Sequence, residues 1–118
     1  MRQMTRRLTW KESIAVAMTE AELSENVRQL ASGLHYLTYH TWRSDHSAAG
    51  YPDWTLVKQG RLIFVELKRQ RGKTSKYQEQ WLGALRECPL IEVYEWHPSD
   101  WIDGTIQQVL AGTPSPLA

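Results

Sequence analysis

The sequence predicts an α/β protein in which a mixed β-sheet is flanked by helices, in the order α-β-β-β-α-β-α. Two capped segments, which begin at Thr19 and Ser75, carry apolar residues at helical spacing. Between and after them lie short runs rich in β-branched and aromatic residues, which are typical of strands. The chain has 118 residues, enough for one domain with a hydrophobic core of its own.

The composition is that of a globular protein, with 42% hydrophobic and 23% charged residues. Because Cys88 is the only cysteine, an internal disulfide and a thiolate zinc cluster are excluded, which fits a reducing cytosol. No apolar run approaches the roughly 18 residues of a membrane span, and the first residues lack the apolar core of a signal peptide. We therefore expect a cytoplasmic protein that does not bind a membrane.

The first two elements are predicted to be helical. Residues 1–18 are expected to be an N-terminal arm or a short helix, with helix-compatible residues from Trp10 onward. Thr19 and Glu22 form a capping box that begins the next helix. Glu20 precedes the first apolar residue of its stripe by three positions, so we expect it on the buried side, where a carboxylate needs a partner or a metal. The alternative is that Glu20 only favours the positive end of the helix. The stripe consists of Leu23, Val27, Leu30, Ala31 and Leu34.

A strand over residues 36–42 is followed by a polar loop and then by a predicted β-hairpin, whose two-residue turn is Gln59-Gly60. This register sets Asp53 opposite Glu66, and the strand period of two places Lys68 on the same face as Glu66. Two carboxylates at a cross-strand separation of roughly 4.5–5.5 Å repel each other. A cation between them would remove the repulsion, so the hairpin is a candidate metal site.

Beyond the hairpin, Ser75 begins a second capped helix whose capping box is closed by Gln78, and Pro89 ends it. Residues 90–96 predict another strand. The expected packing side of the helix is Tyr77, Trp81, Leu82, Leu85 and Cys88.

The C-terminal region is predicted to hold one last short helix over residues 101–110, capped by Ser99 and Asp100 and weakened by Gly104. Residues 113–118 are expected to be a flexible tail.

Basic residues gather directly after the acidic pair, although the net charge of the chain is only +1. Such a local patch can hold phosphates even in a nearly neutral protein. The alternative is a solvated basic loop, but its position beside the carboxylates favours phosphate binding. The candidate contacts are Arg69, Arg71, Lys73 and Lys76, with Arg43 in the loop before the hairpin.

Asp53 and Glu66 are hard oxygen ligands on strands, which suit Mg²⁺ or Mn²⁺, and the backbone carbonyl of Leu67 between the charged residues could be a further ligand. Glu20 is an additional candidate ligand. A metal there would polarise a phosphodiester and generate hydroxide. Lys68 would orient the attacking water or neutralise charge on phosphorus.

Pro52-Asp53 followed by Glu66-Leu67-Lys68, after a helical glutamate, resembles the PD-(D/E)xK nuclease superfamily. More narrowly, the chain from about Thr19 to Leu110 resembles the VRR-NUC family. It departs from that family at His35, where a glycine is often found. The segments that carry the resemblance are 19–22, 49–53, 64–68 and 75–78.

The resemblance implies a restriction-endonuclease-like core over residues 19–112 and metal-dependent hydrolysis of DNA phosphodiester bonds. It implies that Asp53 and Glu66 bind the metal and that Lys68 is the catalytic lysine. Glu20 would be the helical acid, in competition with Glu22 and Glu25. Gln78 corresponds to a glutamine after the core motif, although its capping role explains it equally well. The basic residues would then contact DNA.

Stand-alone members of this family come from bacteria and phages, so the resemblance places the protein in the cytoplasm of a bacterial or phage-infected cell. They resemble Holliday-junction resolvases, which implies branched DNA as the substrate and a homodimer whose two sites cut two strands. The alternatives are a nickase, flap nuclease or general DNase of the same fold, a non-catalytic DNA-binding module, or a structural ion pair. Among the histidines, His40 or His46 could lie near the site and touch phosphate.

Overall fold

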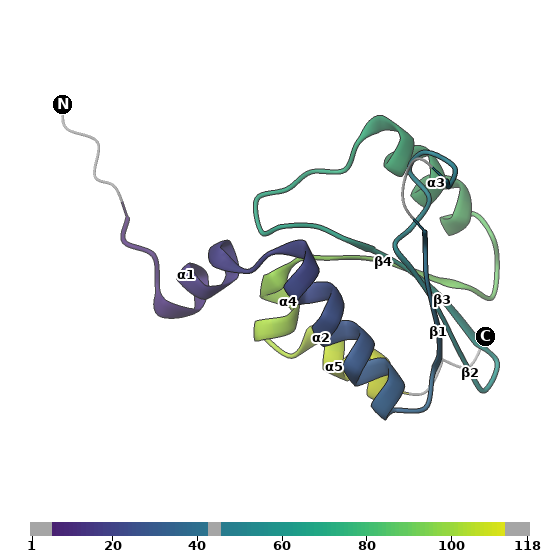
Figure 1. Cartoon of the computed structure of the whole chain (residues 1–118), viewed down its shortest axis with the longest axis horizontal. Helices are drawn as coiled ribbons and strands as arrows, with labels where there is room; N and C mark the ends of the chain where they lie inside the picture. The colour runs from purple at the N-terminus through teal and green to yellow at the C-terminus, as the bar shows by residue number, and fades with distance from the viewer. Residues whose placement is uncertain (1–5, 43–45, 113–118) are drawn as a thin grey trace.

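A computed structural model describes residues 6–42 and 46–112. Arg43 and the predicted tail at 113–118 therefore lie outside the described residues. The helices and strands, shown in Figure 1, are α1 (Trp10–Ala17), α2 (Glu20–Gly33), β1 (Leu37–His40), β2 (Trp54–Lys58), β3 (Arg61–Leu67), α3 (Lys76–Arg86), β4 (Glu92–Trp96), α4 (Pro98–Ile102) and α5 (Thr105–Ala111).

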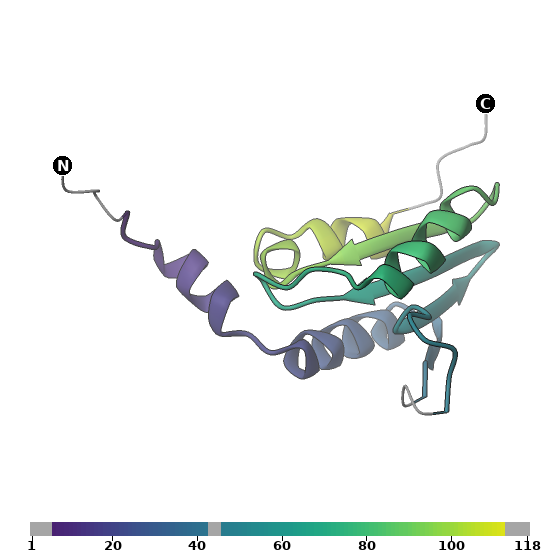
Figure 2. The same cartoon turned by 90° about the horizontal axis from the view of Figure 1, so that it is seen from above.

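The four strands form one mixed sheet in the order β1-β2-β3-β4, which confirms the predicted α/β class. The first three strands are antiparallel, and β4 runs parallel to β3. Helices α2 and α5 bury their apolar sides against one face of the sheet, and α3 lies against the other (Figure 1). Helix α1 projects from this body toward the N-terminus in both views (Figure 2).

The central hairpin has the predicted register, with Val57 opposite Leu62 and Lys58 opposite Arg61. Gln59 and Gly60 have φ of 46° and 82°, the two positive values that a type I′ turn requires. Pairing continues to Trp54, so Asp53 comes next, at the end of the hairpin where Glu66 lies.

The first helices agree with their sequence signals. Thr19 and Glu22 make the predicted capping box at the start of α2, whose residues Leu23, Val27 and Ala31 are fully buried. Residues 10–18 contain a helix, α1, which has a capping box of its own between Thr9 and Glu12.

Three predicted boundaries were wrong at the C-terminal side. The expected helix over 101–110 is two helices, because Gly104 takes a φ of 86° and interrupts the chain between α4 and α5. Helix α4 begins earlier than predicted, at Pro98, where the Asp100 carboxylate accepts the N–H of His97. The strand expected over 90–96 begins at Glu92, because Leu90 has a φ of 71°.

Two further expectations need correction. The strand predicted over 36–42 is only Leu37–His40. The packing side of α3 is narrower than predicted: Leu82 is buried, but Tyr77 is 58% exposed and Cys88 lies beyond the end of the helix at Arg86. The observed element order also contains two helices before the first strand and two after the last.

A buried arginine joins the far end of the hairpin to the C-terminal helix. Arg61 is 5% exposed and binds the Glu92 carboxylate through two nitrogens at 2.6 and 2.7 Å. It also donates to the Tyr36 hydroxyl and to the carbonyls of Val109 and Gly112. This arrangement fixes α5 to the sheet. Within the described residues, no helix is long and apolar enough to cross a membrane.

Gly50 fixes the approach of the chain to Asp53. Its φ is 82°, and a Cβ built on it would lie 2.3 Å from the backbone carbon of Tyr77 at the start of α3. Since real Cβ atoms do not come so close, the loop before the hairpin can pack on α3 only with glycine at this position.

We expect Gly50→Ala to destabilise the protein more than Gly60→Ala does. Both glycines have a φ of 82°, but nothing lies within 4 Å of a Cβ on Gly60. The difference between the two losses in free energy of unfolding isolates the clash with α3, which should cost about 1–3 kcal/mol beyond backbone strain. Urea denaturation of the two variants measures these free energies. Equal losses would show that the Gly50 contact does not constrain the fold.

Candidate active site

A pocket of about 580 Å³ opens where the ends of β2 and β3 meet α2. It brings together all five of the predicted catalytic side chains and adds further residues from α2 and β1. The lining residues are Glu20, Ala21, Ser24, Glu25, Arg28, His40, Asp53, Trp54, Glu66, Leu67, Lys68 and Gln78.

Glu66 lines this pocket and is only 1% exposed. Its Oε1 accepts a hydrogen bond of 2.7 Å from the Gln78 amide. Its Oε2 is buried and has no hydrogen-bond partner among the described residues. Burial, followed by the negative charge of Asp53, raises the pKa of Glu66 to about 8. The ionised carboxylate is therefore incompletely stabilised by the protein alone.

Asp53 reaches the same place from the loop before β2. Its Oδ2 accepts the backbone N–H of Leu67 at 2.7 Å, which holds the carboxylate beside β3. Burial raises the pKa of Asp53, and this hydrogen bond opposes the shift. The nearby charge of Glu20 raises the pKa further, whereas Lys68 lowers it.

Lys68 supplies a positive charge at the edge of the pair. Its Nζ lies 3.6 Å from Oε1 of Glu66, and 12% of its side chain is exposed. This ammonium lowers the pKa of both Glu66 and Asp53, but burial outweighs it in each case. The strand period thus places Lys68 at the acid pair, as predicted.

Glu20 lies on the rim of the pocket and is exposed, so the expectation that it is buried was wrong. It is the first residue of α2, one turn before the part of the helix that the sheet covers. Its negative charge nevertheless raises the pKa of both Asp53 and Glu66. Of the rival acids, Glu22 closes the capping box, and Glu25 lines the pocket but is paired there with Arg28 at 2.5 Å.

Gln78 has both of the roles that its sequence position allowed. Its Oε1 accepts the Ser75 N–H at 2.7 Å and completes the capping box of α3. Its Nε2 donates to Glu66 in the pocket. One side chain therefore connects the start of α3 to the buried carboxylate.

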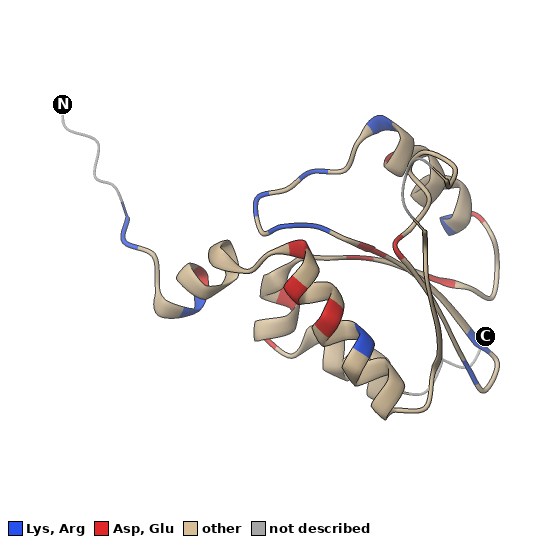
Figure 3. Cartoon of the chain, in the orientation of Figure 1, with Lys and Arg blue, Asp and Glu red and all other residues tan. Residues whose placement is uncertain are grey.

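The basic loop that leaves β3 borders a second pocket of about 450 Å³, adjacent to the first. Figure 3 shows its lysines and arginines along the segment between β3 and α3. Arg69, Arg71 and Lys73 line this pocket, and none of them has an ion-pair partner within the described part of the chain. Lys76 is exposed at the start of α3 and lines neither pocket.

Four residues of the pocket were not singled out as site residues from the sequence: Ala21, Ser24, Arg28 and Trp54. Arg28 follows Glu20 and Ser24 at intervals of four, so helical spacing could have placed it on the same face. Trp54 donates its indole N–H to Ser24 at 2.9 Å and joins the hairpin to α2.

Of the two histidines that were candidates near the site, His40 lines the pocket and lowers the pKa of Asp53. His46 instead stacks on Trp42, with ring centroids 4.4 Å apart.

The side chains and backbone carbonyls that line the pocket include candidate ligands for a divalent metal. Within residues 6–42 and 46–112, no group of three or more His, Cys, Asp or Glu side chains is arranged to hold one, so Glu20 does not complete a three-acid site. Asp53, Glu66 and the Leu67 carbonyl provide oxygen donors at one edge of the pocket, and the unpartnered Oε2 of Glu66 lacks a positive partner. This set fits Mg²⁺ or Mn²⁺, which bind through a few carboxylates and retain water.

Comparisons with protein-family models, curated proteins and solved structures found no match. The VRR-NUC resemblance therefore stays a prediction.

In metal-free buffer, we expect stability to fall as the pH rises from about 4.5 to about 8. Folded Glu66 keeps its proton until its raised pKa, whereas the unfolded chain releases it near 4.5. The folded state thus binds more protons in this interval, and the free energy of unfolding decreases. Urea denaturation in chelator should show a Glu66-dependent decrease of roughly 2–4 kcal/mol. An unchanged pH dependence in Glu66→Gln would contradict the assignment.

Gln78→Glu and Ser75→Ala should separate the two roles of Gln78. Glutamate can still accept the Ser75 N–H, but it has no N–H for Glu66 and adds negative charge beside it. The decline in stability should still begin near pH 4.5 but should continue to a higher pH in Gln78→Glu, because the folded-state pKa of Glu66 rises further. Ser75→Ala should instead lower stability by about 1 kcal/mol throughout the pH range. The same pH profile in both variants would mean that Gln78 only caps the helix.

Proposed function

We propose that this protein is a divalent-metal-dependent endonuclease that hydrolyses DNA phosphodiester bonds. The observation that carries the proposal is the buried Glu66 carboxylate, which has one unpartnered oxygen and lies beside Asp53 and Lys68. A structural ion pair would be expected to neutralise its carboxylate, but here Lys68 faces two acids and the pKa of each is raised. The pocket therefore favours an additional cation.

Asp53, Glu66 and the carbonyl of Leu67 would hold Mg²⁺ or Mn²⁺, with Glu20 on the rim acting through water. The metal would supply polarisation of the phosphodiester and a bound water with a lowered pKa. The protein's own groups then have distinct tasks. The Lys68 ammonium orients the attacking water or neutralises charge that develops on phosphorus. Gln78 holds the Glu66 carboxylate in place through its amide.

The DNA backbone would follow the basic loop. Arg69, Arg71 and Lys73 line the pocket next to the active site, where they can contact phosphates on one side of the cleaved bond. Lys76 and Arg43 remain further candidates for such contacts. Branched DNA is the proposed substrate, cut by a homodimer with two sites in the cytoplasm of a bacterial or phage-infected cell. A nickase, flap nuclease or general DNase is the alternative within the same chemistry.

A second candidate function is a non-catalytic DNA-binding module. The observation that favours it is the lack of a three-acid metal group within the described residues. Its basic surface would be the same, so binding alone does not separate the two functions.

We expect the protein to cut DNA in Mg²⁺ or Mn²⁺ and not in chelator. Asp53→Asn and Glu66→Gln should each lower cleavage by at least 10²-fold, because each removes a charged metal ligand. Lys68→Ala should lower cleavage while the metal still binds. The measurement is cleavage of four-way junctions, flaps, single strands and linear duplex by each variant.

Glu87→Gln is the matched control, because Glu87 is an exposed acid at the end of α3 that lines none of the pockets around the site. It should cut like the wild type. The acid variants should keep their fold and most of their DNA affinity. Retained DNA binding without metal-dependent cutting of any substrate by the wild type would instead support the binding module.

A further inference from the structure

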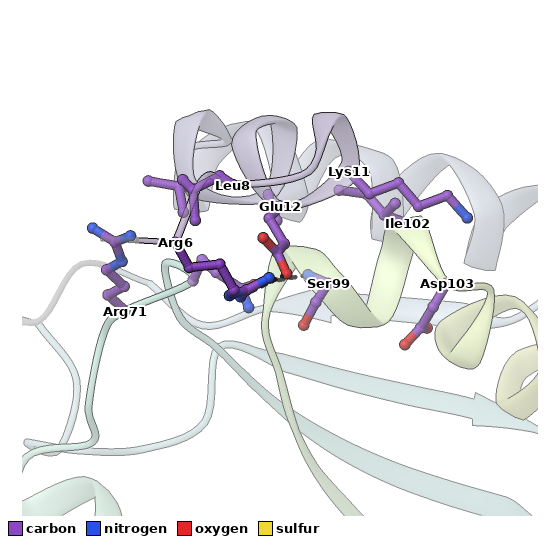
Figure 4. A pocket seen from close by; sticks show the side chains of 11 residues that line it. Arg6, Leu8, Lys11, Glu12, Arg71, Ser99, Ile102 and Asp103 are labelled. Atoms are coloured by element: carbon purple, nitrogen blue, oxygen red, sulfur yellow. Dashed lines mark hydrogen bonds and ion pairs between the residues drawn. The ribbon is translucent and has the colours of Figure 1, made fainter. Parts of the chain in front are cut away.

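A cleft of about 340 Å³ lies between α1 and α4, outside the catalytic pocket (Figure 4). Its lining combines an apolar part with a positively charged rim. The apolar residues are Leu8, Ala15, Val16 and Ile102, and the basic residues are Arg6, Lys11 and Arg71. Neither the fold nor the proposed chemistry requires an open cleft at this place.

The cleft is continuous with the candidate active site. It shares Val16, Gln70 and Arg71 with the pocket along the basic loop. That pocket in turn shares Glu20 and Lys68 with the catalytic pocket. One groove therefore extends from the acid pair, along the basic loop, to the space beneath α1.

The charges of the cleft favour an anion. Its two carboxylates are already engaged within the chain: Glu12 accepts from Arg6 and from the Thr9 N–H, and Asp103 accepts from Thr105. Arg71 and Lys11 have no ion-pair partner among the described residues. In Figure 4 the Arg6 side chain lies beneath Glu12, whereas Arg71 lies at the opposite end of the labelled residues from Asp103.

We infer that the cleft between α1 and α4 binds an unpaired DNA strand that continues from the cleaved phosphodiester. The cleft has a volume of only about 340 Å³ and is enclosed by α1, α4 and the basic loop, which leaves no room for a duplex. A single strand can place its phosphates on the basic rim and the flat faces of its bases on apolar side chains. This inference rests on the proposed function and narrows its substrate to DNA with an unpaired flank.

The test compares Lys11→Gln and Leu8→Ser in the full chain. Both residues are exposed, and Leu8 precedes α1, so neither change should unfold the protein. Arg86→Gln is the matched control, because Arg86 is exposed on α3 and lines none of the three pockets of the groove. Binding of a fluorescent single-stranded oligodeoxythymidylate and of a blunt duplex is measured by anisotropy in chelator over a range of salt concentrations.

Lys11→Gln should weaken single-strand binding several-fold and reduce the slope of log affinity against log salt by about 0.7, the value for one lost phosphate contact. Leu8→Ser should weaken binding without changing that slope, because it removes apolar contact only. Duplex binding should be the same in both variants and in the wild type. The inference would be overturned if Lys11→Gln and Leu8→Ser bound the single strand as tightly as Arg86→Gln does. It would also be overturned if they lost as much affinity for the duplex as for the single strand.

Cleavage distinguishes the failure of this inference from the failure of the proposed function. The wild type should cut a duplex with an unpaired flank faster than a blunt one, and Lys11→Gln should lose that preference. Normal cutting with unchanged flank preference in Lys11→Gln would reject the cleft alone. Selective loss of strand binding in a protein that cuts nothing would reject the nuclease and keep the strand-binding site.

Discussion

The burial of the Glu66 carboxylate on the central strand is the constraint on which the site depends. Removing a charged group from water is costly unless other groups replace the lost hydration. Three segments meet at this carboxylate: Gln78 donates from α3, Lys68 directly follows the last residue of β3, and Asp53 is held beside it by the Leu67 N–H. Gly50 then allows the Asp53 loop to touch α3. The loop before Asp53, the hairpin and α3 thus pack around one carboxylate, that of Glu66, whose charge is only partly compensated.

The other end of the same strand shows how this fold treats a charge that is purely structural. Arg61 is nearly as buried as Glu66, but Glu92, Tyr36 and two backbone carbonyls occupy its donors. Glu66 instead keeps an unpartnered oxygen and has a second acid as its neighbour. Since the chain can satisfy a buried charge fully at one end of β3, the incomplete compensation at the other end supports a functional reading.

Local signals account for what could be predicted from the sequence. The Gln59-Gly60 turn set the hairpin register, and the capping boxes at Thr19 and Ser75 located α2 and α3, because each involves residues within a few positions of one another. Errors arose where distant segments decide the outcome. The exposure of Glu20 depends on where the sheet ends beneath α2, and the Arg61 contacts join residues up to 51 positions apart. Periodicity contains neither kind of information.

Under the proposed function, the chemistry and the selection of substrate would depend on different parts of this chain. Asp53, Glu66 and Lys68 lie in or next to one hairpin, whose register follows from its turn, so the placement of the acid pair depends mainly on residues close together in the sequence. The cleft beneath α1 requires residues from opposite ends of the chain, such as Leu8 and Ile102, to come together. If the cleft binds DNA as proposed, changes in α1 would alter which DNA reaches the acids while the acids keep their geometry. A helix that projects from the body would then still contribute to the groove that leads to the site.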